Sequence, residues 1–234
     1  MRSVSERTLS TLLTVAAITI AVALVRREFF TEQAASREKL DAGYKSDWRS
    51  MLQSGRTIGN PSAPISIVVF SEMQCPFCRA FHATVTRLQE LHSGKIAYTF
   101  IHFPIAAHAQ AFSASHAAEC AHEQGEFARL VDVAFLNQSQ LGIRRWSLLA
   151  QDAGVKDTAL FNRCMEIESV PALISSGKAL GEKLRVGGTP TVFINGWRIN
   201  GAPPDSQMTR VVEDLLAGRK PYKGFPPAAV VANR

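Results

Sequence analysis

Two short apolar runs in the first half of the chain have the character of buried strands. Residues 65–70 and 96–101 are rich in β-branched and aromatic side chains and lie between turn-forming residues, which predicts a strand in each. Residues 79–92, between them, are predicted to form a helix. Because a strand–helix–strand unit normally has a right-handed crossover, the two strands are expected to be parallel neighbours in one sheet.

A long helical region follows, and a strand hairpin with a last helix completes the pattern. Glycines, together with Asp157 as a candidate N-cap, divide the region into predicted helices at residues 107–123, 126–137, 144–153, 157–168 and 170–184. A break at residues 187–190 ends the helical pattern. Beyond it the sequence predicts two strands and an amphipathic helix, at residues 191–194, 197–200 and 205–217. The dipeptide Asn195-Gly196 is typical of a two-residue hairpin turn.

An apolar segment lies near the N-terminus and is flanked by arginines. Residues 9–25 carry no charge, and a run of this length is at the lower limit for spanning a bilayer. The run leads into two arginines and a glutamate, not into the small-residue site at which a signal peptide is cleaved. We therefore expect an uncleaved membrane anchor within residues 1–27. A cleaved signal peptide and a buried core helix are the alternatives.

Polar segments border the predicted domain on both sides. Residues 28–56 are mixed in charge and are expected to form a tether with short helices at residues 32–45 and 47–52. A turn cluster at residues 59–64 marks the start of the domain. Residues 218–234 contain prolines and are expected to be a flexible tail.

Composition and charge fit one globular domain with extensions. Of the 234 residues, 46% are hydrophobic and 20% are charged, which is ordinary for a chain that buries a core. The net charge of +6 comes from lysines and arginines scattered among acidic residues. Because the sequence has no basic stripe interleaved with aromatic residues, nucleic acid is not an expected partner. The excess charge is interpreted as solvated surface, with attraction to anionic lipid near the N-terminus.

The candidate chemistry centres on Cys75-Pro76-Phe77-Cys78, between the first predicted strand and its helix. In this setting a C-x-x-C motif is typical of a redox pair, and Pro76 fits the first helical turn. The first N–H groups of a helix have no partner within it, and the helix dipole adds partial positive charge. Both effects favour a thiolate, so Cys75 is the expected nucleophile and Cys78 the resolving thiol. A zinc half-site and a structural disulfide are the alternatives.

Four sequence blocks together resemble the DsbA-like thiol:disulfide oxidoreductases of the thioredoxin superfamily. They are TIGNPSAP, FSEMQCPFC, QGEF and GTPT, at residues 57–64, 70–78, 124–127 and 188–191. The resemblance implies an α/β thioredoxin fold, with a helical domain inserted between its βαβ and ββα halves. The apolar segment at residues 9–25 adds an expected N-terminal transmembrane helix before this fold. The expected divisions are a first half at residues 57–106, an insert at 107–185 and a second half at 186–217.

The resemblance also implies roles for residues outside the cysteine motif. Thr189-Pro190 matches a proline that, in thioredoxin-like proteins, has a cis peptide bond and faces the C-x-x-C motif. The backbone of Thr189 is therefore expected to pair with an extended substrate segment. An ordinary trans proline at the start of a strand is the alternative.

Two departures from the family pattern affect the reactivity expected of Cys75. Pro76-Phe77 lacks the histidine that stabilises the thiolate in the strongly oxidising members of the family, so both are candidate tuning residues. Val69 stands where thioredoxin has a buried acid. Glu72 is then the nearest carboxylate, and it is interpreted either as a proton relay or as a surface side chain without a role.

The remaining cysteines, Cys120 and Cys164, fall on predicted helices of the insert. In an exported chain such a pair is expected to form a structural disulfide, and two buried free thiols are the alternative. His116 and Cys120 have the i, i+4 spacing of metal ligands. Because no second pair with ligand spacing accompanies them, no metal site is expected. His108 is assigned no role.

These features predict a membrane-anchored thiol:disulfide oxidoreductase, preferably a disulfide oxidase, with its soluble domain in the periplasm or otherwise outside the cytoplasmic membrane. Exchange with exported substrate proteins needs no cofactor. Turnover needs a DsbB-like or vitamin-K-epoxide-reductase-like membrane oxidase, or a DsbD-like reductant if electrons flow the other way. A disulfide isomerase or reductase of the same fold, and a non-enzymatic metal- or peptide-binding thiol protein, are the alternatives.

Overall fold

The computed structural model describes residues 12–14, 16–24, 26 and 42–221, in two units that divide between Asp41 and Ala42. The described residues of the first unit are helical. Within the described part of the chain, no helix combines the length and the apolar character needed to cross a membrane. The rest of the predicted anchor lies outside the described residues.

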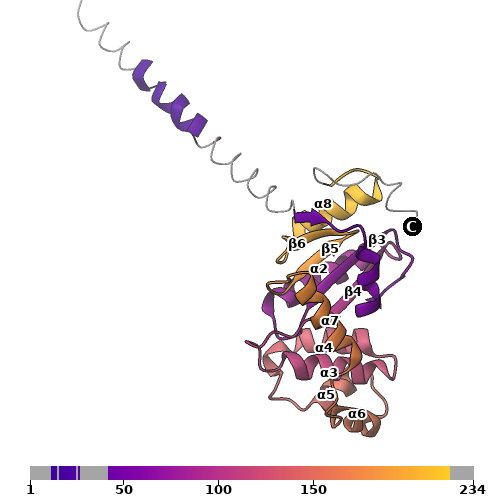
Figure 1. Cartoon of the computed structure of the whole chain (residues 1–234). Coiled ribbons are helices and arrows are strands. Elements are labelled where there is room, and N and C mark those ends of the chain that lie inside the picture. Colours follow the sequence, from indigo (N-terminus) through magenta and orange to yellow (C-terminus); the bar gives the residue numbers. More distant parts are fainter. Residues whose placement is uncertain (1–11, 15, 25, 27–41, 222–234) are drawn as a thin grey trace, which may run out of the picture. The chain divides into compact units, whose positions relative to one another are not determined.

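A six-stranded sheet lies at the centre of the second unit (Figure 1). Its order is β1-β6-β5-β3-β4-β2, with the strands at Ala42–Tyr44, Trp197–Asn200, Thr191–Ile194, Ile65–Ser71, Ile96–His102 and Arg56–Ile58. β3 and β4 are parallel, as predicted, and the other pairs are antiparallel. Every residue of β3 and β4 is buried. Because both faces of these strands are covered, they read in the sequence as continuous apolar runs.

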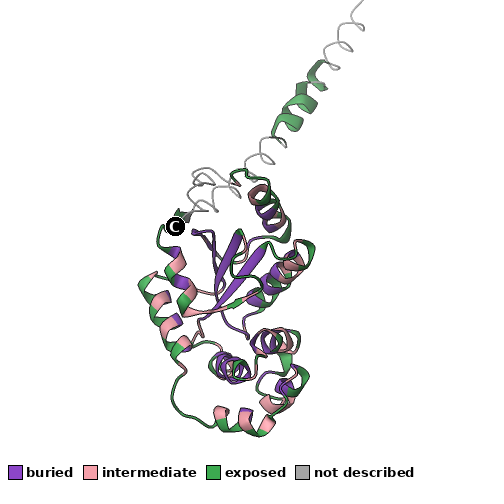
Figure 2. Ribbon diagram, turned by 90° about the vertical axis from the view of Figure 1, so that its right-hand side faces the viewer, coloured by how far each residue is buried: buried purple, intermediate pink, exposed green. Residues whose placement is uncertain are grey.

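Helices cover both faces of this sheet (Figure 2). The helices of this unit are α2 (Pro76–Leu91), α3 (Ala111–His122), α4 (Phe127–Leu136), α5 (Trp146–Asp152), α6 (Thr158–Met165), α7 (Ala172–Lys183) and α8 (Asp205–Leu216), with 3-10 helices η1 (Trp48–Ser54) and η2 (Gln138–Gln140). α2 packs against α8 and β4, whereas α7 packs against β4 and η1. Since side chains alternate along a strand, Val68 and Phe70 of β3 share the core that also contains Trp48 of η1.

Residues 42–56 belong to the folded domain, which corrects the expectation of a tether over residues 28–56. β1 pairs with β6 at the edge of the sheet, where the sequence suggested the end of a helix. Trp48 and Met51 of η1 are only 3% and 2% exposed and join the core beneath the sheet. β1 has three residues and its partner lies near the other end of the chain, so no local pattern identifies it. Residues 28–41 lie outside the described residues.

The helical insert is arranged around α3, which contacts α4, α5 and α6. α3 is buried over most of its length, in agreement with its alanine-rich sequence. It begins at Ala111, four residues later than predicted. The preceding residues form a loop that contains His108 and Gln110, and both contact the segment that leads to the cysteine motif.

The predicted hairpin turn joins β5 to β6 and also supports β3. Asn195 and Gly196 have φ angles of 46° and 90°, the left-handed region that such a turn requires. The side chain of Asn195 accepts the N–H of Ser66 at 2.7 Å and donates to the carbonyl oxygen of Pro64 at 3.1 Å. The turn therefore fixes the start of β3. Residues 222–234 of the predicted tail lie outside the described residues.

Candidate active site

The C-x-x-C motif starts α2 directly after β3. Cys75 is the N-cap residue and Pro76 occupies the first turn, where its missing N–H has no helical partner to lose. The N–H of Cys78 donates to Sγ of Cys75 at 3.4 Å. Both cysteines carry free thiols and are buried. The helix geometry therefore brings the two sulfur atoms to the same side of the first turn.

The pKa values of the two thiols are shifted in opposite directions. The pKa of Cys75 is lowered to about 5, mainly by the hydrogen bond from the Cys78 thiol and further by the backbone N–H groups of the first turn, against the opposing effect of burial. The pKa of Cys78 is raised, first by burial and then by its contact with Cys75. At neutral pH, Cys75 is therefore a thiolate and Cys78 is a thiol. This difference is the one required of an attacking and a resolving cysteine.

The loop before β5 faces the cysteine motif. The Thr189-Pro190 peptide bond is cis, and Sγ of Cys75 lies 3.4 Å from the carbonyl oxygen of Thr189. The carbonyl oxygen of Pro190 accepts the N–H of Gly201 at 3.0 Å, which ties the loop to the residue after β6. The fold thus brings Thr189 into contact with Sγ of Cys75, although the two residues are more than a hundred positions apart in the sequence.

The helical insert holds the segment that leads into the motif. The side-chain amide of Gln138 donates to the carbonyl oxygens of Met73 and Cys75, both at 2.9 Å. The side-chain oxygen of Gln74 accepts the N–H of Gln110 at 2.6 Å. These contacts had no sequence signal, because Gln138 and Gln110 lie far along the chain from the motif and act through an ordinary side-chain amide and a backbone N–H.

Glu72 is fully buried, so its interpretation as a surface side chain is wrong. One carboxylate oxygen accepts the N–H of Gln74 at 2.7 Å, and the other is hydrogen-bonded to Nδ1 of His108. Burial is the main cause that raises the pKa of Glu72, while the bond to His108 lowers it. His108 therefore belongs to the surroundings of the redox pair, although the sequence assigned it no role.

The side chain of Phe77 projects from the motif and is 67% exposed. An apolar ring beside the reactive sulfur offers contact surface to a polypeptide substrate but carries no charge to stabilise the thiolate. Besides the Cys78 thiol, the contact with Thr189 and the backbone N–H groups of the first turn of α2 lower the pKa of Cys75.

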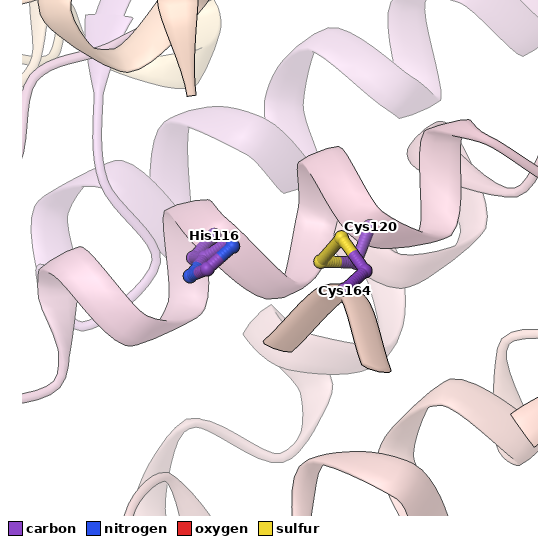
Figure 3. A group of neighbouring side chains, drawn as sticks. All are labelled: His116, Cys120 and Cys164. Atoms are coloured by element: carbon purple, nitrogen blue, oxygen red, sulfur yellow. A yellow bond between two sulfur atoms is a disulfide. The ribbon is translucent and has the colours of Figure 1, made fainter. Parts of the chain in front are cut away.

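Cys120 of α3 and Cys164 of α6 are joined by a disulfide, with their Cα atoms 5.7 Å apart (Figure 3). A ring nitrogen of His116 and the two sulfur atoms lie within 4.8 Å of one another. Metal binding requires thiolates, and the disulfide consumes both thiols. In this state the group does not suit a metal ion, and its role is to connect two helices of the insert.

A C-x-x-C motif at a helix start, opposite a cis proline on a mixed sheet of this order, is the arrangement of the thioredoxin fold. The sequence model of the family described as Thioredoxin matches residues 52–214, most of the chain. This chain belongs to the thioredoxin family. The assignment confirms the resemblance to DsbA-like thiol:disulfide oxidoreductases that the sequence indicated.

Named relatives and a solved structure agree with this family. A probable disulfide bond formation protein D from Bacillus cereus is 28% identical over 192 residues, covering 76% of this chain and 85% of that protein. The Na(+)/H(+) antiporter NhaA 1 of Mycolicibacterium gilvum is 29% identical over 164 residues, covering 69% of this chain but 26% of the antiporter. The chain thus spans about a quarter of the length of the antiporter relatives it matches. The structure of oxidised BdbD from Bacillus subtilis has the same fold, with a TM-score of 0.63, 18% identity, and coverage of 76% of this chain and 98% of that one.

Proposed function

We propose that this chain catalyses disulfide exchange in proteins outside the cytoplasm, with Cys75 as the nucleophile and Cys78 as the resolving thiol. The observation that carries the proposal is the position of Cys75 Sγ. It accepts the N–H of Cys78 at the start of α2 and lies 3.4 Å from the carbonyl oxygen of Thr189. Its lowered pKa makes it both a thiolate at neutral pH and a good leaving group.

In the oxidising direction, a substrate thiolate attacks Sγ of Cys75 in the Cys75–Cys78 disulfide. The bond between the two enzyme sulfur atoms breaks, and Cys78 leaves as a thiolate and takes up a proton because burial raises its pKa. A second substrate thiolate then attacks the substrate sulfur of the mixed disulfide, and Cys75 leaves as a thiolate. The substrate loses two electrons and gains a disulfide, while the enzyme pair gains both electrons.

The preferred direction is oxidation of the substrate. Stabilising the Cys75 thiolate stabilises the reduced form of the enzyme, and a pair with a stable reduced form is a stronger oxidant. A pKa of about 5 lies well below that of a free thiol, at roughly 8.5. The relative named as a probable disulfide bond formation protein D supports the same direction.

Substrate binding is assigned to the Thr189-Pro190 loop. The carbonyl group of Thr189, beside the reactive sulfur, can accept a hydrogen bond from the backbone of an extended substrate, as in strand addition to a sheet edge. Phe77, exposed next to Cys75, adds apolar contact. Recognition through backbone groups suits an enzyme whose substrates share a cysteine and little else.

The cellular setting and the redox partner complete the proposal. Disulfide formation suits an oxidising compartment, so the domain is placed in the periplasm or its equivalent, with the apolar segment at residues 9–25 as an anchor. Regeneration of the disulfide then requires a membrane oxidase of the DsbB-like or vitamin-K-epoxide-reductase-like kind. A DsbD-like reductant would take that place if the protein worked as an isomerase or reductase.

Separate substitutions of the two cysteines test the assigned roles. With an unfolded protein that contains disulfide bonds as substrate, and each variant in its reduced form, Cys75→Ser is expected to abolish exchange, because the sulfur that attacks the substrate disulfide is gone. Cys78→Ser is expected to accumulate mixed disulfides through Cys75, which non-reducing electrophoresis detects. A variant that replaces both Cys120 and Cys164 by serine is the control and should retain exchange. Equal, mild losses from both single substitutions would contradict these roles and favour a non-enzymatic thiol protein, which metal titration would then examine.

A further inference from the structure

A carboxyl–imidazole pair borders the redox cysteines and takes no part in the exchange steps described above. Glu72 lies three residues before Cys75 and is 0% exposed. Its carboxylate has two partners, the N–H of Gln74 and the imidazole of His108. A buried carboxylate with a single neutral donor would favour its protonated form, so the imidazole decides how much charge this site carries.

The pair responds to the charge on Cys75. After burial and the contacts with its two partners, the negative charge of the Cys75 thiolate is a further cause that raises the pKa of Glu72. The backbone N–H of Glu72 also faces the sulfur of Cys78. Glu72 is therefore linked electrostatically to one cysteine and by its backbone to the other.

His108 connects this buried carboxylate to solvent. Its side chain is 28% exposed and lines a groove of about 680 Å³ between the loop before α3 and α7. Phe112 and Ile174 give the groove an apolar wall, and Lys178 and Glu182 of α7 are the charged residues that line it with His108. One ring nitrogen of His108 thus contacts a buried acid, while part of the side chain borders the groove.

We propose that Glu72 and His108 share a proton whose binding is coupled to the redox state of Cys75, and that His108 exchanges this proton with the groove. The inference rests on the proposed function only in that Cys75 alternates between thiolate and disulfide. When the disulfide forms, the negative charge on Cys75 disappears, and the pair releases part of a proton. On reduction, two electrons enter the disulfide, Cys78 binds one proton, Cys75 stays a thiolate and the pair binds an additional fraction of a proton.

The sign of the coupling follows from linkage. A nearby negative charge favours the protonated form of a group, and the effect is reciprocal. Between pH 5 and pH 8 the dithiol state carries the Cys75 charge and the disulfide state does not, since the thiolate forms near pH 5. The pair should therefore keep its proton to higher pH in the dithiol state.

Histidine-labelled NMR titration of the full chain in both redox states tests this directly. The His108 ring signals, which report the shared proton, are expected to change at higher pH in the dithiol state than in the disulfide state, while the signals of His122, exposed on α3, should not depend on the redox state. Glu72→Gln should remove most of the His108 difference. Identical His108 midpoints in the two states of the unsubstituted protein would overturn the proposal, and a full difference in Glu72→Gln would show that the coupling bypasses Glu72.

A second readout separates proton coupling from a structural role of His108. The redox potential of the Cys75–Cys78 pair should fall with pH more steeply than one proton per two electrons in the unsubstituted protein. In His108→Asn the slope should return to one proton per two electrons, whereas His122→Asn leaves it steep. An unchanged slope in His108→Asn contradicts the inference. If no Cys75–Cys78 disulfide forms, the proposed function fails instead, so the two failures are distinguishable.

Discussion

At the scale of single residues, the pKa values of two identical side chains in one helical turn are shifted in opposite directions. Cys75 caps α2 and accepts hydrogen bonds, so its pKa falls to about 5, whereas Cys78 is buried behind it and its pKa rises. The sequence predicted a lowered pKa for Cys75 from the helix start. It could not reveal that the largest cause is the Cys78 thiol itself, because that contact depends on how two side chains meet in space.

Three residues that shape the site had no signal in the sequence. Gln138, Gln110 and His108 all contact residues 72–75 from the insert. Each is an ordinary residue type at a position far along the chain from the motif. Only the folded arrangement of the insert against the sheet brings them there, so the pattern of the motif could not point to them.

Gln138→Ala removes the side-chain donor that holds the carbonyl oxygens of Met73 and Cys75. We expect the free energy of unfolding to fall by about 1–3 kcal/mol. The alkylation midpoint of Cys75 should move to higher pH, because the loop no longer holds Sγ against the N–H groups of α2. Urea denaturation and alkylation kinetics measure the two effects.

Gln140→Ala, an exposed position on the same short helix, is the matched control and should change neither quantity. If Gln138→Ala also leaves the free energy of unfolding and the alkylation midpoint unchanged, the hydrogen bonds of Gln138 do not contribute to the site.

At the scale of elements, local patterns predicted what local interactions determine. The buried strands β3 and β4, the turn at Asn195-Gly196 and the helices of the insert all follow from short sequence signals and are present. β1 was not predicted, because a strand of three residues has no sequence pattern of its own and forms only by pairing with β6. The late start of α3 has a similar cause, since the loop before it is held by Gln74 and Glu72 and not by its own sequence.

The disulfide between α3 and α6 connects positions 44 residues apart and should stabilise the insert by restricting the unfolded chain. Replacing Cys120 and Cys164 together by alanine is expected to lower the free energy of unfolding by about 2–4 kcal/mol. The alkylation midpoint of Cys75 should stay the same, because none of the contacts described around residues 72–75 involves either cysteine. Denaturation with and without the disulfide, at fixed pH, measures the loss.

Two outcomes would contradict the assignment of a structural role to Cys120–Cys164 and a redox role to Cys75–Cys78. An unchanged free energy of unfolding would mean that the disulfide does not stabilise the insert. A shifted alkylation midpoint of Cys75 would mean that the disulfide of the insert affects the reactivity of the active site.

At the scale of the whole molecule, the chain consists of a redox domain and a separate N-terminal segment. The domain begins at β1, earlier than its sequence indicated, because η1 completes the core beneath the sheet. The N-terminal unit contributes helical residues and a short apolar stretch whose proposed use is anchoring.

The anchor proposal predicts how the chain partitions. The full chain should remain with membranes after extraction at alkaline pH, because an inserted apolar segment is held by lipid and not by charge. A chain that starts at residue 42 should appear in the supernatant. Release of the full chain under the same extraction would show that residues 9–25 do not anchor it, whatever the activity of the domain.

The central claim is that Cys75 is a stabilised thiolate and Cys78 a protected thiol. The most direct test is the rate of iodoacetamide alkylation of the reduced protein as a function of pH, with each cysteine followed by mass spectrometry. Cys75 should react with a midpoint near pH 5, while Cys78 stays largely unmodified at neutral pH. A Cys75 midpoint near the ordinary thiol pKa of roughly 8.5, or equal reaction of both cysteines, would contradict the claim.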